Sequence, residues 1–247
     1  MNGGTILKLK SILSAATAIA MVMSMAGCGS KAENSAGNSD AGNTAASQVI
    51  IPVKEDGVTD IIEPEEGSKE MELGSYRQSA SGVKLYYDDA QIPAGVMLLL
   101  ERYFTAYANH DLEGYKACLF DQYADNMETA LQRDYEYGLD VSFESQCSNL
   151  ETMAAEGSGV WRDGAAVPFK VSRVKAEATG NDDPAEFFDY LDTMFDMDYY
   201  EFVKSNSDKL YDLYFYVMGD VEGTETLLVE DFEIVVAEKD GRYYTFG

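Results

Sequence analysis

The sequence is poor in the residues from which most familiar active sites are built. Its 247 residues include one histidine, one tryptophan and three cysteines. A catalytic triad with a histidine base would have to use His110, which lies in a predicted turn and reads most simply as a turn histidine at the surface. No GxSxG, HExxH, P-loop, GxGxxG or CxxC pattern occurs. The sequence therefore predicts no catalytic residue, no cofactor and no metal site.

Positive charge is also scarce. The chain carries 18 Lys and Arg against 44 Asp and Glu, a formal net charge of −26. A nucleic-acid surface needs basic side chains that neutralise phosphates, so the composition excludes nucleic acid as a partner. The 46% of hydrophobic residues, with 12% aromatic, is enough for a real core and excludes a wholly disordered acidic chain.

The N-terminus has the layout of a secretory signal peptide. Residues 1–27 contain two lysines and no acidic residue, and the apolar run 12–25 (ILSAATAIAMVMSM) is shorter than the roughly 20 residues that span a bilayer. The run ends in Met25-Ala26-Gly27-Cys28, which resembles the bacterial lipobox, with Met where Leu is preferred. The resemblance implies cleavage before Cys28 and lipidation of that cysteine. We therefore expect a lipid anchor in the cell membrane, with the chain on its extracytoplasmic face.

A polar stretch follows the expected anchor. Removing residues 1–27 takes away two lysines and no carboxylate, so the net charge falls by two, from −26 to −28. Residues 28–75 are expected to form a flexible acidic and polar tether, because the segment 29–47 holds no apolar side chain larger than Ala. Two apolar patches in the tether, Val49–Val53 and Ile61-Ile62, fit either a strand on the domain edge or isolated apolar points in a linker.

Residues 76–247 carry the periodic patterns of one α+β domain. A short strand is expected at 83–87, followed by helices and then by strands. The first expected helix begins at Pro93, and the second is capped by Asp111 and has an inner face of Leu112, Tyr115, Leu119 and Tyr123. The third carries Met127, Leu131 and Tyr135 and stops at Gly138. The fourth carries Phe143, Cys147, Leu150 and Met153 and ends near Gly157. The expected later elements are a strand over 167–178 with a bulge, an acidic helix from Asp183-Pro184 to Phe202, and strands over 210–218, 226–238 and 243–246, the last two joined by Asp240-Gly241.

Two segments resemble nuclear-transport-factor-2-like domains. Residues 103–119 (YFTAYANHDLEGYKACL) match that family's opening helix, polar-Asp turn and second helix, and the end, EIVVAEKDGRYYTFG, resembles its closing hairpin. Arg242 and Tyr243 stand where the family usually has Lys and Trp. The resemblance implies N-terminal helices packed on a strongly bent, mainly antiparallel sheet that forms a cone with a cavity. It also implies that the chain is a lipoprotein of the Gram-positive type.

The cone fold does not fix a function, since it hosts both enzymes and binding modules. We expect a non-enzymatic module that binds a small ligand, an envelope component or a protein. The alternative is an enzyme of the isomerase or dehydratase type that uses an Asp or Glu in the cavity. The expected cavity residues are aromatic, because Tyr and Trp offer an apolar face and a polar group, although the same residues also suit sheet packing: Tyr103, Tyr107, Trp161, Tyr214 and Tyr216.

The remaining chemistry-bearing residues leave two questions open. Cys118 and Cys147 form either a disulfide, which an exported protein permits, or two buried thiols on apolar helix faces. Asp189, Asp192 and Asp196 fall at helical spacing on one face, which reads as a solvated face or as part of a Ca²⁺ site. No EF-hand loop accompanies them, and side chains along one straight helix rarely converge on an ion.

The predicted anchor has a direct test. The variant Cys28→Ala removes the thiol that would carry the lipid, so it should lose membrane association. Fractionation of cells that express the wild type and the variant measures this. Recovery of Cys28→Ala in the membrane fraction would contradict the hypothesis of a lipid anchor.

Overall fold

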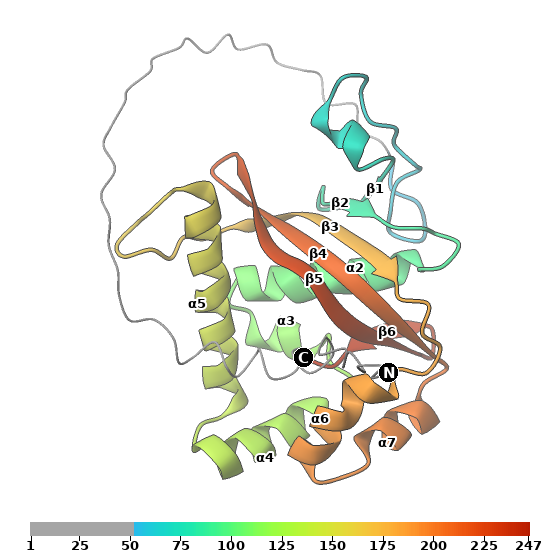
Figure 1. Cartoon of the computed structure of the whole chain (residues 1–247), viewed down its shortest axis with the longest axis vertical. Helices are drawn as coiled ribbons and strands as arrows, with labels where there is room; N and C mark the ends of the chain where they lie inside the picture. The colour runs from blue at the N-terminus through green and yellow to red at the C-terminus, as the bar shows by residue number, and fades with distance from the viewer. Residues whose placement is uncertain (1–51) are drawn as a thin grey trace, which may run out of the picture.

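The computed structural model describes residues 52–247, and the predicted signal peptide and lipidation site lie outside them. These residues form a strongly curled six-stranded mixed sheet with helices, an α+β fold (Figure 1). The strands follow one another across the sheet in chain order, and only β2 and β3 pair in parallel. The strands are β1 (Arg77–Gln78), β2 (Lys84–Tyr86), β3 (Lys170–Ala178), β4 (Lys209–Val221), β5 (Thr224–Lys239) and β6 (Arg242–Thr245). The mainly antiparallel, bent sheet expected from the sequence is confirmed.

The helices fall into two groups, visible in Figure 1. The first group is α2, α3 and α5; α2 packs against β3, and α5 packs against β5. The second group is α4, α6 and α7, which lie together at one end of the sheet. The bounds are α2 (Ala94–Ala108), α3 (Leu112–Lys116), α4 (Tyr123–Tyr135), α5 (Leu139–Ser158), α6 (Ala185–Phe195) and α7 (Tyr199–Asn206), with a 3-10 turn, η2, at Lys69–Glu72. No helix of residues 52–247 has the length and apolar character needed to cross a membrane.

Local signals place several elements as expected. Pro93 precedes the first residue of α2, and Asp111 caps α3 by accepting a hydrogen bond from the Gly114 N–H. The Asp240-Gly241 pair, with φ of 52° and 70°, turns β5 into β6. A register shift in β3 between Val171 and Arg173 confirms the predicted bulge.

Two predicted helices are wrong in extent. The second helix was expected to carry both Tyr115 and Tyr123, but α3 stops at Lys116, because residues 118–120 leave the helix to bond the edge of β6. There the Phe120 N–H donates to the Thr245 carbonyl at 2.9 Å, so Tyr123 instead begins α4. The acidic helix expected to run from Asp183 to Phe202 is broken into α6 and α7, since Asp196 takes a left-handed conformation and Asp198 caps the second piece.

The core is aromatic and lies between the sheet and α2, α3 and α5. Tyr103 and Tyr107 of α2 contact each other and Tyr115 of α3, and Tyr107 and Tyr115 contact Phe143 of α5. The ring centroids are between 5.0 and 5.5 Å apart in these five pairs. Phe104 meets Phe215 of β4 at 5.5 Å. Edge-to-face and tilted ring pairs of this kind add to the free energy gained from burying the rings.

The folded part of the chain begins before Tyr76, where the domain was expected to start. Val58 is fully buried, the Thr59 N–H donates to the Gln78 carbonyl at 2.9 Å, and Ile62 pairs with Tyr76 through two backbone hydrogen bonds. Ile61-Ile62 therefore lies on the edge of the domain, the first of the two alternatives. Residues 58–62, which were expected to belong to the tether, thus contact the sheet.

The variant Val58→Ala tests this docking. It removes buried methyl groups, so we expect the free energy of unfolding to fall by about 2 kcal/mol. Urea unfolding of the full chain measures the change, and Val53→Ala, at a side chain 41% exposed, is the matched control with little effect. Equal stabilities for the two variants would show that residues 52–75 do not pack on the sheet.

Candidate functional site

A cleft of about 700 Å³ opens beside the N-terminal half of α2. Its walls come from three distant parts of the chain: the start of the described residues at Gly57, the turn 79–81 between β1 and β2, and the hairpin residues 241–244. Leu98, Glu101 and Arg102 of α2 lie between these walls. The volume falls within the range of clefts that bind small molecules.

Glu101 is the chemically distinctive residue of the cleft. Its side chain is 7% exposed, and its Oε1 accepts hydrogen bonds from the hydroxyls of Ser79, at 3.0 Å, and Ser81. Its Oε2 is buried and has no hydrogen-bond partner among residues 52–247. Because an unpartnered buried carboxylate oxygen is costly, a hydrogen-bond donor from a bound molecule would stabilise this site.

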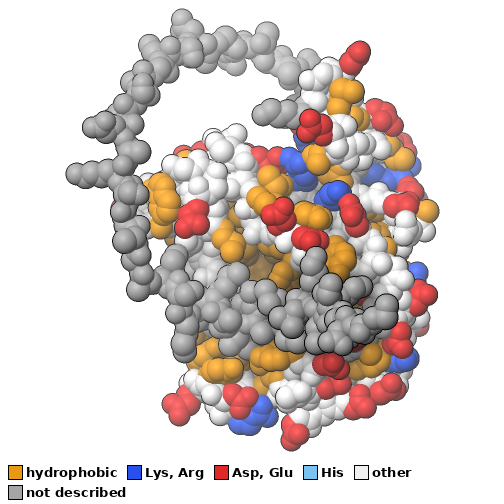
Figure 2. Space-filling model, viewed as in Figure 1, with side chains coloured by type: hydrophobic (Ala, Val, Ile, Leu, Met, Phe, Trp, Pro, Cys, Tyr) orange, Lys and Arg blue, Asp and Glu red, His pale blue; other side chains and the backbone are white. Residues whose placement is uncertain are grey.

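Two arginines line the same cleft. Neither Arg102 nor Arg242 forms an ion pair with a carboxylate of the described chain, although most of the other basic residues there do. Figure 2 shows that Asp and Glu side chains are spread widely over the viewed face. The cleft therefore combines an unsatisfied acceptor with two positive charges that are free to meet an anion.

A glycine shapes one wall of the cleft. Gly95, in the first turn of α2, faces the ring of Tyr243, and a Cβ placed there would come within 2.2 Å of the ring. The glycine thus lets the closing hairpin lie directly against α2. Tyr243 and Tyr244 both line the cleft, and burial raises the pKa of Tyr243.

The five aromatic residues predicted to line a cavity do not come together. Tyr103 and Tyr107 are brought side by side, with hydroxyl oxygens 3.1 Å apart, but they fill the core. Tyr214 and Tyr216 alternate with buried residues of β4 and lie on its opposite face, and Trp161 is 57% exposed. None of the five lines the cleft, and the aromatic residues that do, Tyr243 and Tyr244, belong to the predicted closing hairpin.

The positions of the side chains also decide between the alternatives predicted for the two cysteines and for the three aspartates of the acidic helix. Cys118 and Cys147 are free, buried thiols. The three aspartates of the acidic helix do not gather around a point: the Asp192 carboxylate accepts from the Tyr200 N–H at 3.0 Å, and Asp196 lies beyond the end of α6. Asp189 remains on the helix surface.

Sequence reasoning missed Glu101 and Ser79, since they are 22 positions apart in the chain and leave no local signal. Glu101 also interrupts a buried helix stripe, and an acidic residue at a core position is the signal that could have found it.

Comparison of the chain with protein-family models, with curated proteins and with solved structures finds no match. No residue role or ligand can therefore be carried over from a relative. The resemblance of residues 103–119 and of the closing hairpin to nuclear-transport-factor-2-like domains stays a prediction, and the case for a function depends on the side chains of the cleft.

Asp212 is a second buried carboxylate, and it lies outside the cleft. It is 6% exposed on β4, its Oδ2 accepts from the Asn181 side-chain N–H at 3.0 Å, and its Oδ1 has no partner among the described residues. Burial raises the pKa of Asp212. The pKa of Glu233 on β5 is raised by burial and then by Asp212. The folded state therefore disfavours the ionised form of Asp212.

The variant Asp212→Asn should show this cost as a pH dependence. Above the raised pKa the wild type carries the unfavourable buried charge, whereas below the ordinary pKa of Asp it carries none. The stability difference should therefore move in favour of the variant as the pH rises from about 4 to about 7. Urea unfolding across this range measures it. The exposed control Asp182→Asn should give a flat difference, and a flat difference for Asp212→Asn as well would contradict the assignment.

Proposed function

We propose that this protein is a lipid-anchored, extracytoplasmic lipoprotein whose domain binds a small zwitterionic molecule in the cleft beside α2. The lipobox-like sequence ending at Cys28 supports the anchor. The order of helices and strands and the curled, mainly antiparallel sheet support a cone of the nuclear-transport-factor-2-like type. The observation that carries the binding proposal is the buried, unpartnered Oε2 of Glu101.

The charges of the cleft select the chemical class of the ligand. The Glu101 carboxylate favours a group that donates hydrogen bonds and carries positive charge, such as a primary ammonium. Arg102 and Arg242 favour a carboxylate or another small anion. A molecule with both groups, such as an amino acid or a short unblocked peptide, satisfies the three side chains together. The hydroxyls of Ser79 and Ser81 hold the Glu101 carboxylate in place before the ligand arrives.

A second function uses the same carboxyl. An enzyme of the isomerase or dehydratase type needs a buried Asp or Glu beside its substrate, and Glu101 is the buried carboxylate of the described chain that lines the cleft. Binding and catalysis differ in a simple observable. A binding module returns the bound molecule unchanged, whereas an enzyme converts it, and mass spectrometry of the recovered ligand separates the two.

The binding proposal is tested by calorimetry with defined probes. We expect the full chain to bind unblocked alanyl-alanine, and to bind N-acetylated or amidated alanyl-alanine at least about tenfold more weakly, because each block removes one charge. Glu101→Gln should cause a similar loss for the unblocked peptide. The matched control Glu113→Gln, at an 84% exposed side chain on α3, should leave the affinity unchanged.

Two outcomes would overturn the proposal. The first is that neither the peptide nor its blocked forms bind. The second is that Glu101→Gln and Glu113→Gln bind the peptide equally well, which would place the peptide away from the cleft. Thermal unfolding of both variants guards against a loss of fold, because Glu101 is buried and Glu113 is not.

A further inference from the structure

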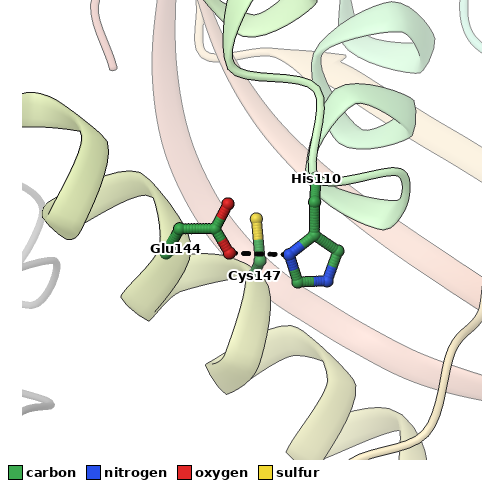
Figure 3. Close-up of side chains that lie close together, drawn as sticks. All are labelled: His110, Glu144 and Cys147. Carbon is green, nitrogen blue, oxygen red and sulfur yellow. Dashed lines mark hydrogen bonds and ion pairs between the residues drawn. The ribbon is translucent and has the colours of Figure 1, made fainter.

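A second group of reactive side chains lies where the turn after α2 meets α5. His110 Nδ1 is 2.7 Å from Glu144 Oε2, and His110 Nε2 is 3.2 Å from Glu151 Oε1. The thiol of Cys147 completes the group: its Sγ, a ring nitrogen of His110 and a carboxylate oxygen of Glu144 all lie within 4.8 Å of one another. Figure 3 shows the sulfur between the imidazole ring and the carboxylate.

Helical spacing and a turn create this group. Glu144, Cys147 and Glu151 occupy positions i, i+3 and i+7 of α5, so their side chains share one face of the helix. His110 follows α2 with a φ of 51°, a left-handed conformation that directs the chain into the Asp111 cap of α3. The ring thus faces α5 from an element that is fixed at both ends.

We propose that His110, Glu144 and Cys147 form a binding site for a divalent metal ion of the zinc class. Imidazole nitrogen, thiolate sulfur and carboxylate oxygen are the three donor types that Zn²⁺ takes in proteins, and three protein ligands leave the fourth position for water. The site is separate from the cleft beside α2, because none of its residues lines that cleft.

The spacing of the donors fits such an ion. Tetrahedral Zn²⁺ with bonds of about 2.0–2.3 Å holds its ligand atoms about 3.5 Å apart. The His110–Glu144 hydrogen bond of 2.7 Å must therefore open by about 0.8 Å, and the other donors must close by about 1.3 Å at most. Rotation of the exposed Glu144 side chain, 56% accessible, changes the distances from its carboxylate without a change in the helix.

Glu151 takes a different part in the site. A histidine that binds a metal through one ring nitrogen usually donates its other N–H to a carboxylate, which fixes the tautomer. With Nδ1 on the metal, the Nε2–H of His110 points to Glu151 at 3.2 Å. Glu151 is thus a positioning residue that acts through His110.

The charges around the thiol favour a cation. Cys147 is fully buried, and the negative charges of Glu144 and Glu151 act on its thiol. A divalent ion offsets this negative charge, since it pairs with the sulfur and with Glu144 at once. On binding, the S–H proton leaves to solvent, and the ion, thiolate and one carboxylate sum to zero charge.

Cobalt(II) is the probe that reports on the sulfur. The test uses the full chain carrying Cys28→Ser, so that Cys118 and Cys147 are its only thiols. At about pH 8, addition of Co²⁺ should produce the near-ultraviolet charge-transfer band of a cobalt–thiolate bond, and Zn²⁺ should abolish it by displacement. Cys147→Ser should remove the band, whereas Cys118→Ser, at the other buried thiol, should keep it.

Variants at residues that are not buried keep the test valid if Cys147→Ser fails to fold. His110→Asn suits the left-handed backbone, because Asn tolerates positive φ, and it should remove the band or weaken Co²⁺ binding at least about 100-fold. Glu151→Gln should weaken binding about tenfold while the band keeps its position. The exposed control Glu156→Gln, also on α5, should have no effect.

The proposal is overturned by any of three results. These are no band on addition of Co²⁺, a band that survives Cys147→Ser but not Cys118→Ser, or equal Co²⁺ affinity for His110→Asn and Glu156→Gln. In each case the group would be a hydrogen-bonded turn in which Glu144 and Glu151 hold His110 against α5. The outcome is independent of the peptide-binding test at Glu101.

Discussion

The structure depends on the packing of one amphipathic helix, α2, against the curled sheet. Helix α2 buries the aromatic stripe of Tyr103, Phe104 and Tyr107 against β3, β4 and α5, and the burial of large apolar rings is a major favourable contribution to folding. The same packing fixes the positions of Glu101, which lies within the helix, and of His110, which follows its last turn. Glu101 faces the cleft, and His110 follows the last turn toward α5.

The edges of the sheet are closed by segments outside the regular strands. Residues 58–62 bond to the β1 side, and residues 118–120 bond to β6. An uncovered edge exposes unpaired N–H and C=O groups to other chains, so these short pairings protect the domain from association. They also bring Gly57 into the wall of the cleft, so that protection of the edge and formation of the site come from the same contacts.

The features that depend on residues adjacent in the chain were predicted from the sequence, whereas the contacts between residues far apart in the chain were not. The opening of α2, the Asp111 cap, the β3 bulge and the Asp240-Gly241 turn each follow from a few adjacent residues. The break at Asp196 did not, because an aspartate with positive φ leaves a pattern like that of a continuous helix. The hydrogen bonds of the two candidate sites join residues 20 to 41 positions apart, and the cleft also includes Arg242 of the closing hairpin, so neither site leaves a local motif.

The cleft beside α2 joins parts of the chain that lie far apart in the sequence. Gly57 lies near the start of the described residues, and 241–244 belong to the hairpin of β5 and β6. A chain that emerges from its N-terminus can thus build α2 and most of the sheet while this cleft still lacks a wall.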